Sequence, residues 1–196
     1  MIRFFDFVFS LLGIVLLSPF LIIIYLLIII ESKGGGFYKQ QRVGLYGVDF
    51  NLYKFRSMAV GSDKKGLITI GGNDARITKV GYFIRKFKLD ELPQLINVLF
   101  GDMSLVGPRP EVRKYVDLYT KEQWKVLTVK PGITDYASIE YANENEILGN
   151  ADNPDKMYIE EIMPAKINLN IKYIDNKNLK EYYNIIFLTF FKIVSK

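Results

Sequence analysis

The chain has 196 residues, a net charge of +5 at pH 7, and neither histidine nor cysteine. This length accommodates one ordinary domain with an appendage, and the lack of cysteine excludes a disulfide scaffold. The chain therefore offers no imidazole base, no thiolate nucleophile and no nitrogen- or sulfur-ligated zinc site. Any catalysis must rest on carboxylates, amines, hydroxyls, backbone amides or a hard metal ion held by oxygen. Magnesium-assisted phosphoryl chemistry fits that inventory.

The positive charge is concentrated in the middle of the chain. Residues 32–88 contain 12 Lys and Arg against 3 Asp and Glu, whereas residues 1–31 and 89–196 are each net negative. A basic segment of this kind indicates either an anionic partner or a solubilising face.

The first predicted element is a membrane helix in residues 1–32. Residues 7–30 are uncharged, and a helix needs about 20 apolar residues to cross a bilayer core. The apolar region of a signal peptide is usually about 7–15 residues and precedes a small-residue cleavage site. This run is longer and lacks such a site, so we expect the segment to be retained.

The dipeptide Ser18-Pro19 lies in the middle of this segment. Proline removes one backbone donor and clashes with the carbonyl four residues earlier, which predicts a kink. The Ser18 hydroxyl is a candidate partner for the freed carbonyl. Two arrangements are consistent with the pattern: a kinked transmembrane helix, or a helix that bends and returns to the same face. Charges flank both ends of the run and do not decide between them.

The remainder, residues 33–196, is predicted to be a helix-rich α/β domain. A glycine hinge at 33–36 precedes strands at 37–43 and 50–55, which form a hairpin around a turn at 46–49. A polar loop is expected at 61–72 and a rigid turn at 107–110. Helical spacing predicts helices at 77–87, 92–99, 111–126, 155–173 and 179–194, the second ended by Gly101. The last helix is almost wholly apolar over 182–191 and reads either as an interfacial helix or as a buried core helix.

The residues that stand out chemically are the adjacent carboxylates Asp90 and Glu91. Asp90 occupies the position of a helix N-cap, with Pro93 in the first turn. The pair also suits a divalent cation, and a helix N-terminus favours an ionised carboxylate of the kind a nucleophile requires. Arg85 lies just upstream, together with two lysines, where it can hold a phosphate. The position of Asp90 alone favours its interpretation as an N-cap over a catalytic or metal-binding role.

Other basic and aromatic side chains have two interpretations. Lys54 and Arg56 point to the same side of an extended segment and form either a phosphate clamp or a solvated strand face. Arg109 is fixed between Pro108 and Pro110 and is either a preorganised phosphate ligand or part of a structural turn. Three aromatic side chains could stack on a base but more often serve in packing: Trp124, Tyr136 and Tyr141.

Taken in order, six segments resemble the bacterial sugar transferase family, the monotopic polyprenol-phosphate phosphoglycosyl transferases. The segments are 41–44 (QRVG), 53–58 (YKFRSM), 74–78 (DARIT), 89–95 (LDELPQL), 101–110 (GDMSLVGPRP) and 130–134 (KPGIT). No single segment is decisive, but their joint order and spacing is specific and covers most of the chain after residue 32. Ser18-Pro19 fits the re-entrant membrane helix of this family, which places both helix ends on the cytoplasmic face.

The resemblance implies a reaction in which a phosphosugar passes from a nucleoside diphosphate sugar, most simply a UDP-sugar, to polyprenol phosphate. It implies that Asp90 attacks the sugar-bearing phosphorus, that Asp90 and Glu91 bind Mg²⁺, and that the reaction is the first membrane step of polysaccharide or glycoprotein glycan synthesis. The expected phosphate-binding residues are Lys54, Arg56, Arg76, Arg85 and Arg109. The implied setting is the cytoplasmic face of the bacterial inner membrane, with membrane lipids as partners and no nucleic acid, and a homo-oligomer is left open.

The sequence departs from the usual family pattern after residue 134. Many members have Gly-aromatic-Ala-Gln where this chain has Asp135, Tyr136, Ala137 and Ser138, so the roles of Asp135 and Ser138 are left open. The chain resembles a minimal catalytic unit without the amino-terminal membrane bundle of larger relatives. The alternative function is a non-enzymatic, membrane-anchored module that binds anionic partners through the basic segment.

Overall fold

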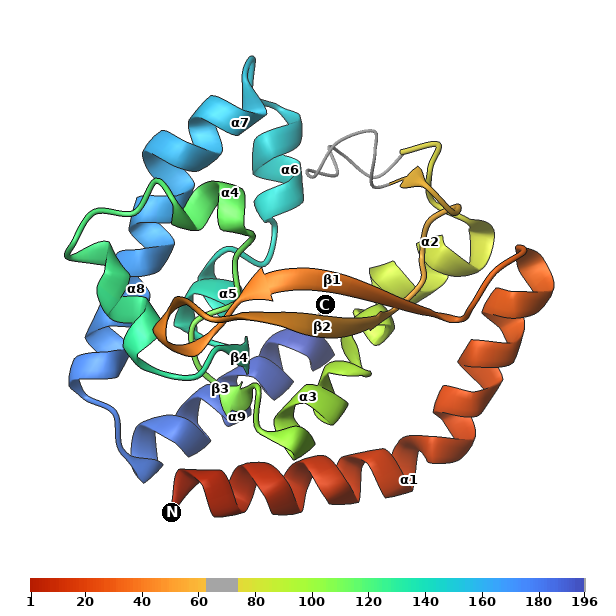
Figure 1. The fold of residues 1–196 in the computed structure, drawn as a ribbon, viewed down its shortest axis with the longest axis horizontal. Coiled ribbons are helices and arrows are strands. Elements are labelled where there is room, and N and C mark those ends of the chain that lie inside the picture. The colour runs from red at the N-terminus through yellow and green to blue at the C-terminus, as the bar shows by residue number, and fades with distance from the viewer. Residues whose placement is uncertain (63–73, 196) are drawn as a thin grey trace.

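The computed structural model describes residues 1–62 and 74–195, without the side chain of Val194 (Figure 1). Most of the predicted loop at 61–72 lies outside the described residues. The helix-rich architecture with a small amount of sheet confirms the predicted fold class. The elements are α1 (Ile2–Glu31), β1 (Phe37–Val43), β2 (Asp49–Phe55), α2 (Lys79–Lys86), α3 (Gln94–Phe100), β3 (Ser104–Val106), α4 (Arg113–Val116), β4 (Gly132–Thr134), α5 (Tyr136–Glu140), α6 (Glu144–Gly149), α7 (Pro154–Met157), α8 (Met163–Asp175) and α9 (Leu179–Val194), with short 3₁₀ turns at Leu45–Gly47, Leu89–Glu91 and Gln123–Thr128.

The long helix α1 bends near its middle, so that its two halves border two sides of the domain (Figure 1). Pro19 lies inside the helix and cannot donate a hydrogen bond to the carbonyl of Val15, four residues earlier. The Ser18 hydroxyl donates to that carbonyl instead, at 2.8 Å. The predicted compensation by Ser18 is therefore present.

Both ends of α1 are fixed to the same domain. Near the start, Arg3 donates to the carbonyls of Val98 and Leu99 at the end of α3, the latter at 2.7 Å. At the other end, the Glu31 carboxylate accepts from the first two amides of α2, at 2.6 and 3.0 Å. An anion is favoured at a helix N-terminus, so this contact stabilises the junction of α1 and α2.

A buried carboxylate reinforces the first of these contacts. Asp6 is 1% exposed, and its Oδ1 accepts from the Ser104 hydroxyl at 3.0 Å, the Leu105 amide at 2.9 Å and the Tyr182 hydroxyl at 2.9 Å. A charge placed so close to an apolar run is tolerated because three donors replace water. These bonds tie the start of α1 to β3 and α9.

Between its two attached ends, α1 presents apolar side chains outward. Val15 is 60% and Leu16 is 75% exposed, whereas Ile24 and Ile28 are buried against Phe55 and other side chains. Among the described residues, α1 is the one helix long and apolar enough to cross a membrane. An apolar helix with this much exposed surface is not a core helix of a soluble domain.

The two predicted strands form an antiparallel hairpin, with Phe37 opposite Phe55 and Val43 opposite Asp49. A second, parallel pair was not predicted: β3 and β4 are three residues each and pair Ser104 with Gly132. Strands this short carry no periodicity from which to predict them.

Three helical predictions need correction. The helix expected at 111–126 is only α4 and a later 3₁₀ turn, because Thr120 and Gln123 exchange side-chain-to-backbone hydrogen bonds that compete with the helix. The helix expected at 155–173 is interrupted by a π-helical segment at Tyr158–Ile162. The helix expected at 77–87 is shorter: α2 ends at Lys86, and Phe87 lies beyond its end and is 52% exposed.

The last helix, α9, combines the two alternatives considered for it. Tyr182 and Ile185 are fully buried in its first half, whereas Phe187 and Phe190 are 59% and 64% exposed in its second half. The helix is therefore anchored in the core at one end and leaves an apolar face open at the other.

Candidate active site

The two adjacent carboxylates lie in a 3₁₀ turn between α2 and α3. Lys88 adopts the left-handed conformation, with φ of 57°, which turns the chain sharply after α2. Helix α3 begins only at Gln94, with Pro93 as its N-cap residue. The prediction that Asp90 caps this helix is therefore wrong, because a second turn of different geometry separates Asp90 from the helix start.

The Asp90 carboxylate has no fixed partner in the part of the chain that the structure describes. The residue is 8% exposed, and its carboxylate accepts no hydrogen bond from residues 1–62 or 74–195. Burial raises the pKa of Asp90, the neighbouring Glu91 raises it further, and Lys54, Arg85 and Lys88 oppose both effects. Contrary to the sequence-based expectation, the surroundings do not favour the ionised form. The oxygens remain available for a ligand or a reaction.

Glu91 has the opposite environment. Arg109 donates both guanidinium nitrogens to its two carboxylate oxygens, through Nη1 at 3.1 Å and through Nη2, and Lys54 Nζ donates to Oε1 at 3.3 Å. Burial alone would raise the pKa of Glu91, but Arg109 and Lys54 outweigh it and hold that pKa well below its usual range. Glu91 is thus an ionised anchor that holds two cations beside Asp90.

The Pro108-Arg109-Pro110 turn is positioned by contacts from two strands. β3 and β4 pair in parallel, and the chain just after β3 passes so close to β4 that a Cβ at Gly132 would lie 2.1 Å from the Gly107 nitrogen. The Gly107 amide donates to the Thr134 carbonyl at 3.0 Å, and the Arg109 amide donates to Asp135 Oδ2 at 3.1 Å. Arg109 therefore approaches Glu91 from a backbone that is held on both sides.

The structure brings together four of the predicted site residues and separates the others from them. Asp90, Glu91, Lys54 and Arg109 form one cluster, and Arg85 lies at its margin, with Nη1 3.5 Å from the Ser57 hydroxyl.

Two other predicted phosphate-binding arginines have partners within the protein. Arg56 is 8% exposed and donates to the Ser32 and Lys33 carbonyls at the end of α1, both at 2.8 Å. Arg76 is paired with Asp74 and reaches the Ser62 carbonyl at 3.3 Å. Neither contacts the carboxylate pair.

Sequence reasoning missed a second buried ionic group beside Arg109. Arg42 donates to the Pro110 carbonyl at 3.1 Å and to Glu111 at 3.2 Å, and Glu111 also accepts from the Tyr158 hydroxyl. Burial lowers the pKa of Arg42 despite its pairing with Glu111. The partners are 69 and 47 residues apart in sequence, so no local pattern could have revealed them.

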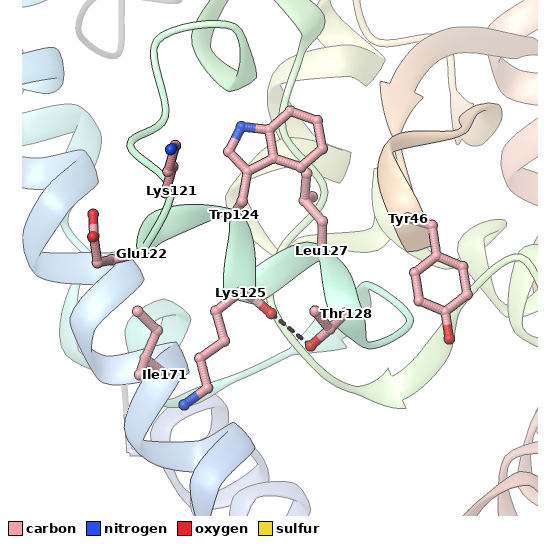
Figure 2. Close-up of a pocket in the computed structure, with 8 residues that line it drawn as sticks. All are labelled: Tyr46, Lys121, Glu122, Trp124, Lys125, Leu127, Thr128 and Ile171. Carbon is pink, nitrogen blue, oxygen red and sulfur yellow. Dashed lines mark hydrogen bonds between the residues drawn. The ribbon is translucent and has the colours of Figure 1, made fainter.

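A groove lies elsewhere on the surface. It has a volume of about 680 Å³, and the exposed rings of Tyr46 and Trp124 are part of its lining (Figure 2). No member of the carboxylate cluster lines it. Tyr136 and Tyr141, the other two aromatic candidates, contact α9 and the core instead.

Asp90 and Glu91 fit a metal ion that is also bound by substrate phosphates better than a metal ion bound by protein ligands alone. Among residues 1–62 and 74–195, no three acidic side chains gather to hold a metal. Mg²⁺ is usually held by one or two carboxylates together with substrate phosphates and water. The Asp90 oxygens have no hydrogen-bond partner among the described residues and could serve this purpose, whereas Glu91 would have to give up a bond to Arg109 or Lys54.

The cluster adjoins the apolar surface of α1. Leu89, directly before Asp90, packs with Ile24 and Ile28 of α1. Two residues further back, Phe87 is half-exposed. Asp90 therefore lies beside the apolar helix.

The chain is similar to known proteins over most of its length. The profile of the family described as bacterial sugar transferase matches residues 1–196. The chain is 40% identical over 190 residues to a UDP-glucose:undecaprenyl-phosphate glucose-1-phosphate transferase of Klebsiella pneumoniae, covering 95% of this chain and 38% of that protein. It is 38% identical over 188 residues to a UDP-N-acetylgalactosamine-undecaprenyl-phosphate N-acetylgalactosaminephosphotransferase of Aeromonas hydrophila, covering 94% and 41%.

A shorter relative is covered more fully. The sugar transferase EpsL of Bacillus subtilis strain 168, itself uncharacterized, is 39% identical over 175 residues, which are 88% of this chain and 78% of that protein. The chain thus spans about two fifths of the length of the first two relatives and most of the third. From the match over its full length and these identities, the chain belongs to the bacterial sugar transferase family.

Proposed function

We propose that the protein is a phosphoglycosyl transferase that moves a phosphosugar from a UDP-sugar to polyprenol phosphate. The observation that carries this proposal is Asp90, a nearly buried carboxylate that accepts no hydrogen bond from the described residues. It lies next to a cation-bound Glu91 and beside an exposed apolar helix. The relatives named for UDP-sugar and undecaprenyl-phosphate substrates support the same chemistry.

In the proposed reaction, an Asp90 oxygen attacks the sugar-bearing phosphorus of the nucleoside diphosphate sugar. The bond from this phosphorus to the bridging oxygen breaks, and the nucleoside monophosphate leaves. An oxygen of polyprenol phosphate then attacks the same phosphorus, which releases the Asp90 carboxylate and forms polyprenol diphosphosugar. A covalent carboxylate intermediate divides one difficult transfer into two easier ones.

The neighbouring residues supply charge and position. Arg109 and Lys54 neutralise phosphate charge while Glu91 holds them in place, which costs no reorganisation during the reaction. Mg²⁺, held by Asp90 and Glu91 together with the substrate phosphates, would add further charge neutralisation. The product would be the first lipid-linked intermediate of a polysaccharide or glycoprotein glycan.

The direct test is a panel of sugar nucleotides, including UDP-glucose and UDP-N-acetylgalactosamine, incubated with detergent-solubilised protein and polyprenol phosphate. We expect at least one donor to release UMP in a lipid-dependent reaction that EDTA abolishes. If no donor releases monophosphate, and the protein instead binds anionic vesicles with steep salt dependence, the non-enzymatic alternative is correct.

We further propose that α1 is re-entrant and that the domain lies on the cytoplasmic face of the inner membrane. Arg3 and Asp6 bond to the same domain that Glu31 contacts. A helix crossing the bilayer would separate its two ends by about 30 Å of hydrocarbon, so one of these sets of contacts would have to break.

This topology predicts the labelling of single cysteines. The natural chain has none, so Ile2→Cys gives one reactive site. We expect a membrane-impermeant maleimide to label it only after cells are permeabilised, as for Lys121→Cys in the exposed part of the domain. Labelling of residue 2 in intact cells, with Lys121→Cys still protected, would contradict the re-entrant arrangement.

A further inference from the structure

Asp135 is a buried carboxylate that the proposed chemistry does not use directly. It is 0% exposed, and each of its oxygens accepts one backbone amide: Oδ1 from Ser138 at 2.6 Å and Oδ2 from Arg109 at 3.1 Å. The first bond caps the short helix α5. The second joins this cap to the turn that carries Arg109.

The two bonds require a carboxylate. Other helices of this chain are capped by amides: Asn153 Oδ1 accepts from Lys156 at 3.1 Å, and Asn178 Oδ1 accepts from Glu181 at 2.9 Å. An asparagine offers one acceptor oxygen, and its other terminal atom is a donor. Capping of α5 accounts for the bond to Oδ1 of Asp135. It does not account for the bond between Oδ2 and the Arg109 amide, nor for the presence of a carboxylate where an amide would cap the helix.

The Arg109 amide is a natural anchor point for its turn. Proline has no amide hydrogen, so the Arg109 amide is the only backbone donor in the Pro108-Arg109-Pro110 tripeptide. That donor points to Asp135. The close backbone contact of Gly107 with Gly132 brings Asp135, three residues after Gly132, within reach of the Arg109 amide.

We propose that Asp135 is a positioning residue for phosphosugar transfer, which fixes the Arg109 turn so that the guanidinium stays aligned with Glu91 beside Asp90. The kinetic part of this inference rests on the proposed function. Asp135 does not touch the reacting atoms and acts through Arg109. A displacement of about 1 Å in such a group can reduce a rate about 100-fold.

The test compares Asp135→Ser, Asp135→Asn, Arg109→Lys and the double variant Asp135→Ser/Arg109→Lys. Serine still caps α5 but is too short to reach the Arg109 amide as well. We expect Asp135→Ser to lower the kcat of UMP release about 10- to 100-fold with little change in KM. In the Arg109→Lys background, the same change should add less than about 3-fold, because residues acting through one group are not additive. The control Asn153→Ser exchanges the cap of α7, far from Arg109 in sequence, and should leave kcat unchanged.

Full additivity in the double variant, or equal losses in Asp135→Ser and Asn153→Ser, would overturn the inference. Hydrogen exchange at the Arg109 amide provides a readout that needs no activity. Exchange should accelerate in Asp135→Ser and Asp135→Asn and stay unchanged in Asn153→Ser. If wild-type protein releases no UMP, the proposed function fails, while unaltered Arg109 exchange in the Asp135 variants overturns the anchoring itself.

Discussion

Asp90→Asn is expected to reduce release of nucleoside monophosphate by at least about 10³-fold, the scale of loss found when a nucleophile is removed. The amide cannot form the acyl-phosphate bond that the proposed mechanism requires. The measurement is single-turnover UMP release from the preferred sugar nucleotide. Undiminished turnover would remove Asp90 from the chemistry.

The same substitution should not destabilise the protein. Burial and Glu91 raise the pKa of Asp90, so the folded state binds this proton more tightly than the unfolded state, whose aspartate has a pKa of about 3.9. The stabilisation is present below that value and is lost as pH rises through the folded pKa. Near pH 7, replacing the ionised group by a neutral amide removes an unfavourable charge, and the unfolding temperature should be unchanged or higher.

Asp102→Asn is the matched control for Asp90→Asn. Asp102 lies at the opposite end of α3, where its carboxylate accepts from Asn97 at 3.2 Å, and an asparagine oxygen can still accept that bond. We expect near-normal turnover in this variant. Equal losses in the two variants would show that the effect arises from the fold of α3 and not from the nucleophile.

The second large effect is expected for Arg109→Lys. Lysine keeps the charge but cannot reproduce the two-pronged contact with Glu91. We expect kcat to fall about 10- to 100-fold because a misaligned cation neutralises less charge in the transition state. The free energy of unfolding should fall by about 1–2 kcal/mol, since Lys54 still pairs with Glu91 and Arg109 is about one third exposed.

The loss of stability in Arg109→Lys should depend on pH. The pKa of Glu91 is held well below its usual range, so its pairing stabilises the fold above the unfolded value of about 4.3 and is lost as pH falls through the folded pKa. Chemical denaturation should therefore show a gap between wild type and variant at pH 7 that shrinks in acid. Arg113→Lys is the control: Arg113 is 41% exposed and pairs with Asp49 at the surface, so its replacement should change little. A gap independent of pH would contradict the role given to Glu91.

The local parts of the fold were predictable from the sequence. The hairpin, the bend at Ser18-Pro19 and the end of α3 follow from alternation, proline chemistry and Gly101, which adopts φ of 92° at the helix C-cap. The α4 region was not predictable in this way, because the side chains of Thr120 and Gln123 accept hydrogen bonds from each other's backbone amides and divide the expected helix.

In the candidate site too, the residues with local sequence signals were predictable and those with long-range contacts were not. Asp90, Glu91 and Arg109 stand out through adjacency and through flanking prolines, both of which are local signals. The burial of Asp135, the pairing of Arg42 with Glu111, and the attachment of Arg56 to α1 arise only when distant segments meet. Such pairings depend on tertiary structure, and the single sequence contains no pattern for them.

The most direct test of the account is intact mass spectrometry of the protein after incubation with its sugar nucleotide and Mg²⁺ in the absence of lipid. We predict a mass increase equal to one covalently bound phosphosugar, located on Asp90 by peptide mapping, absent from Asp90→Asn, and removed when polyprenol phosphate is added. If wild-type protein turns over with lipid present but forms no such adduct without it, the lipid phosphate attacks the sugar nucleotide directly, and the covalent role of Asp90 is contradicted.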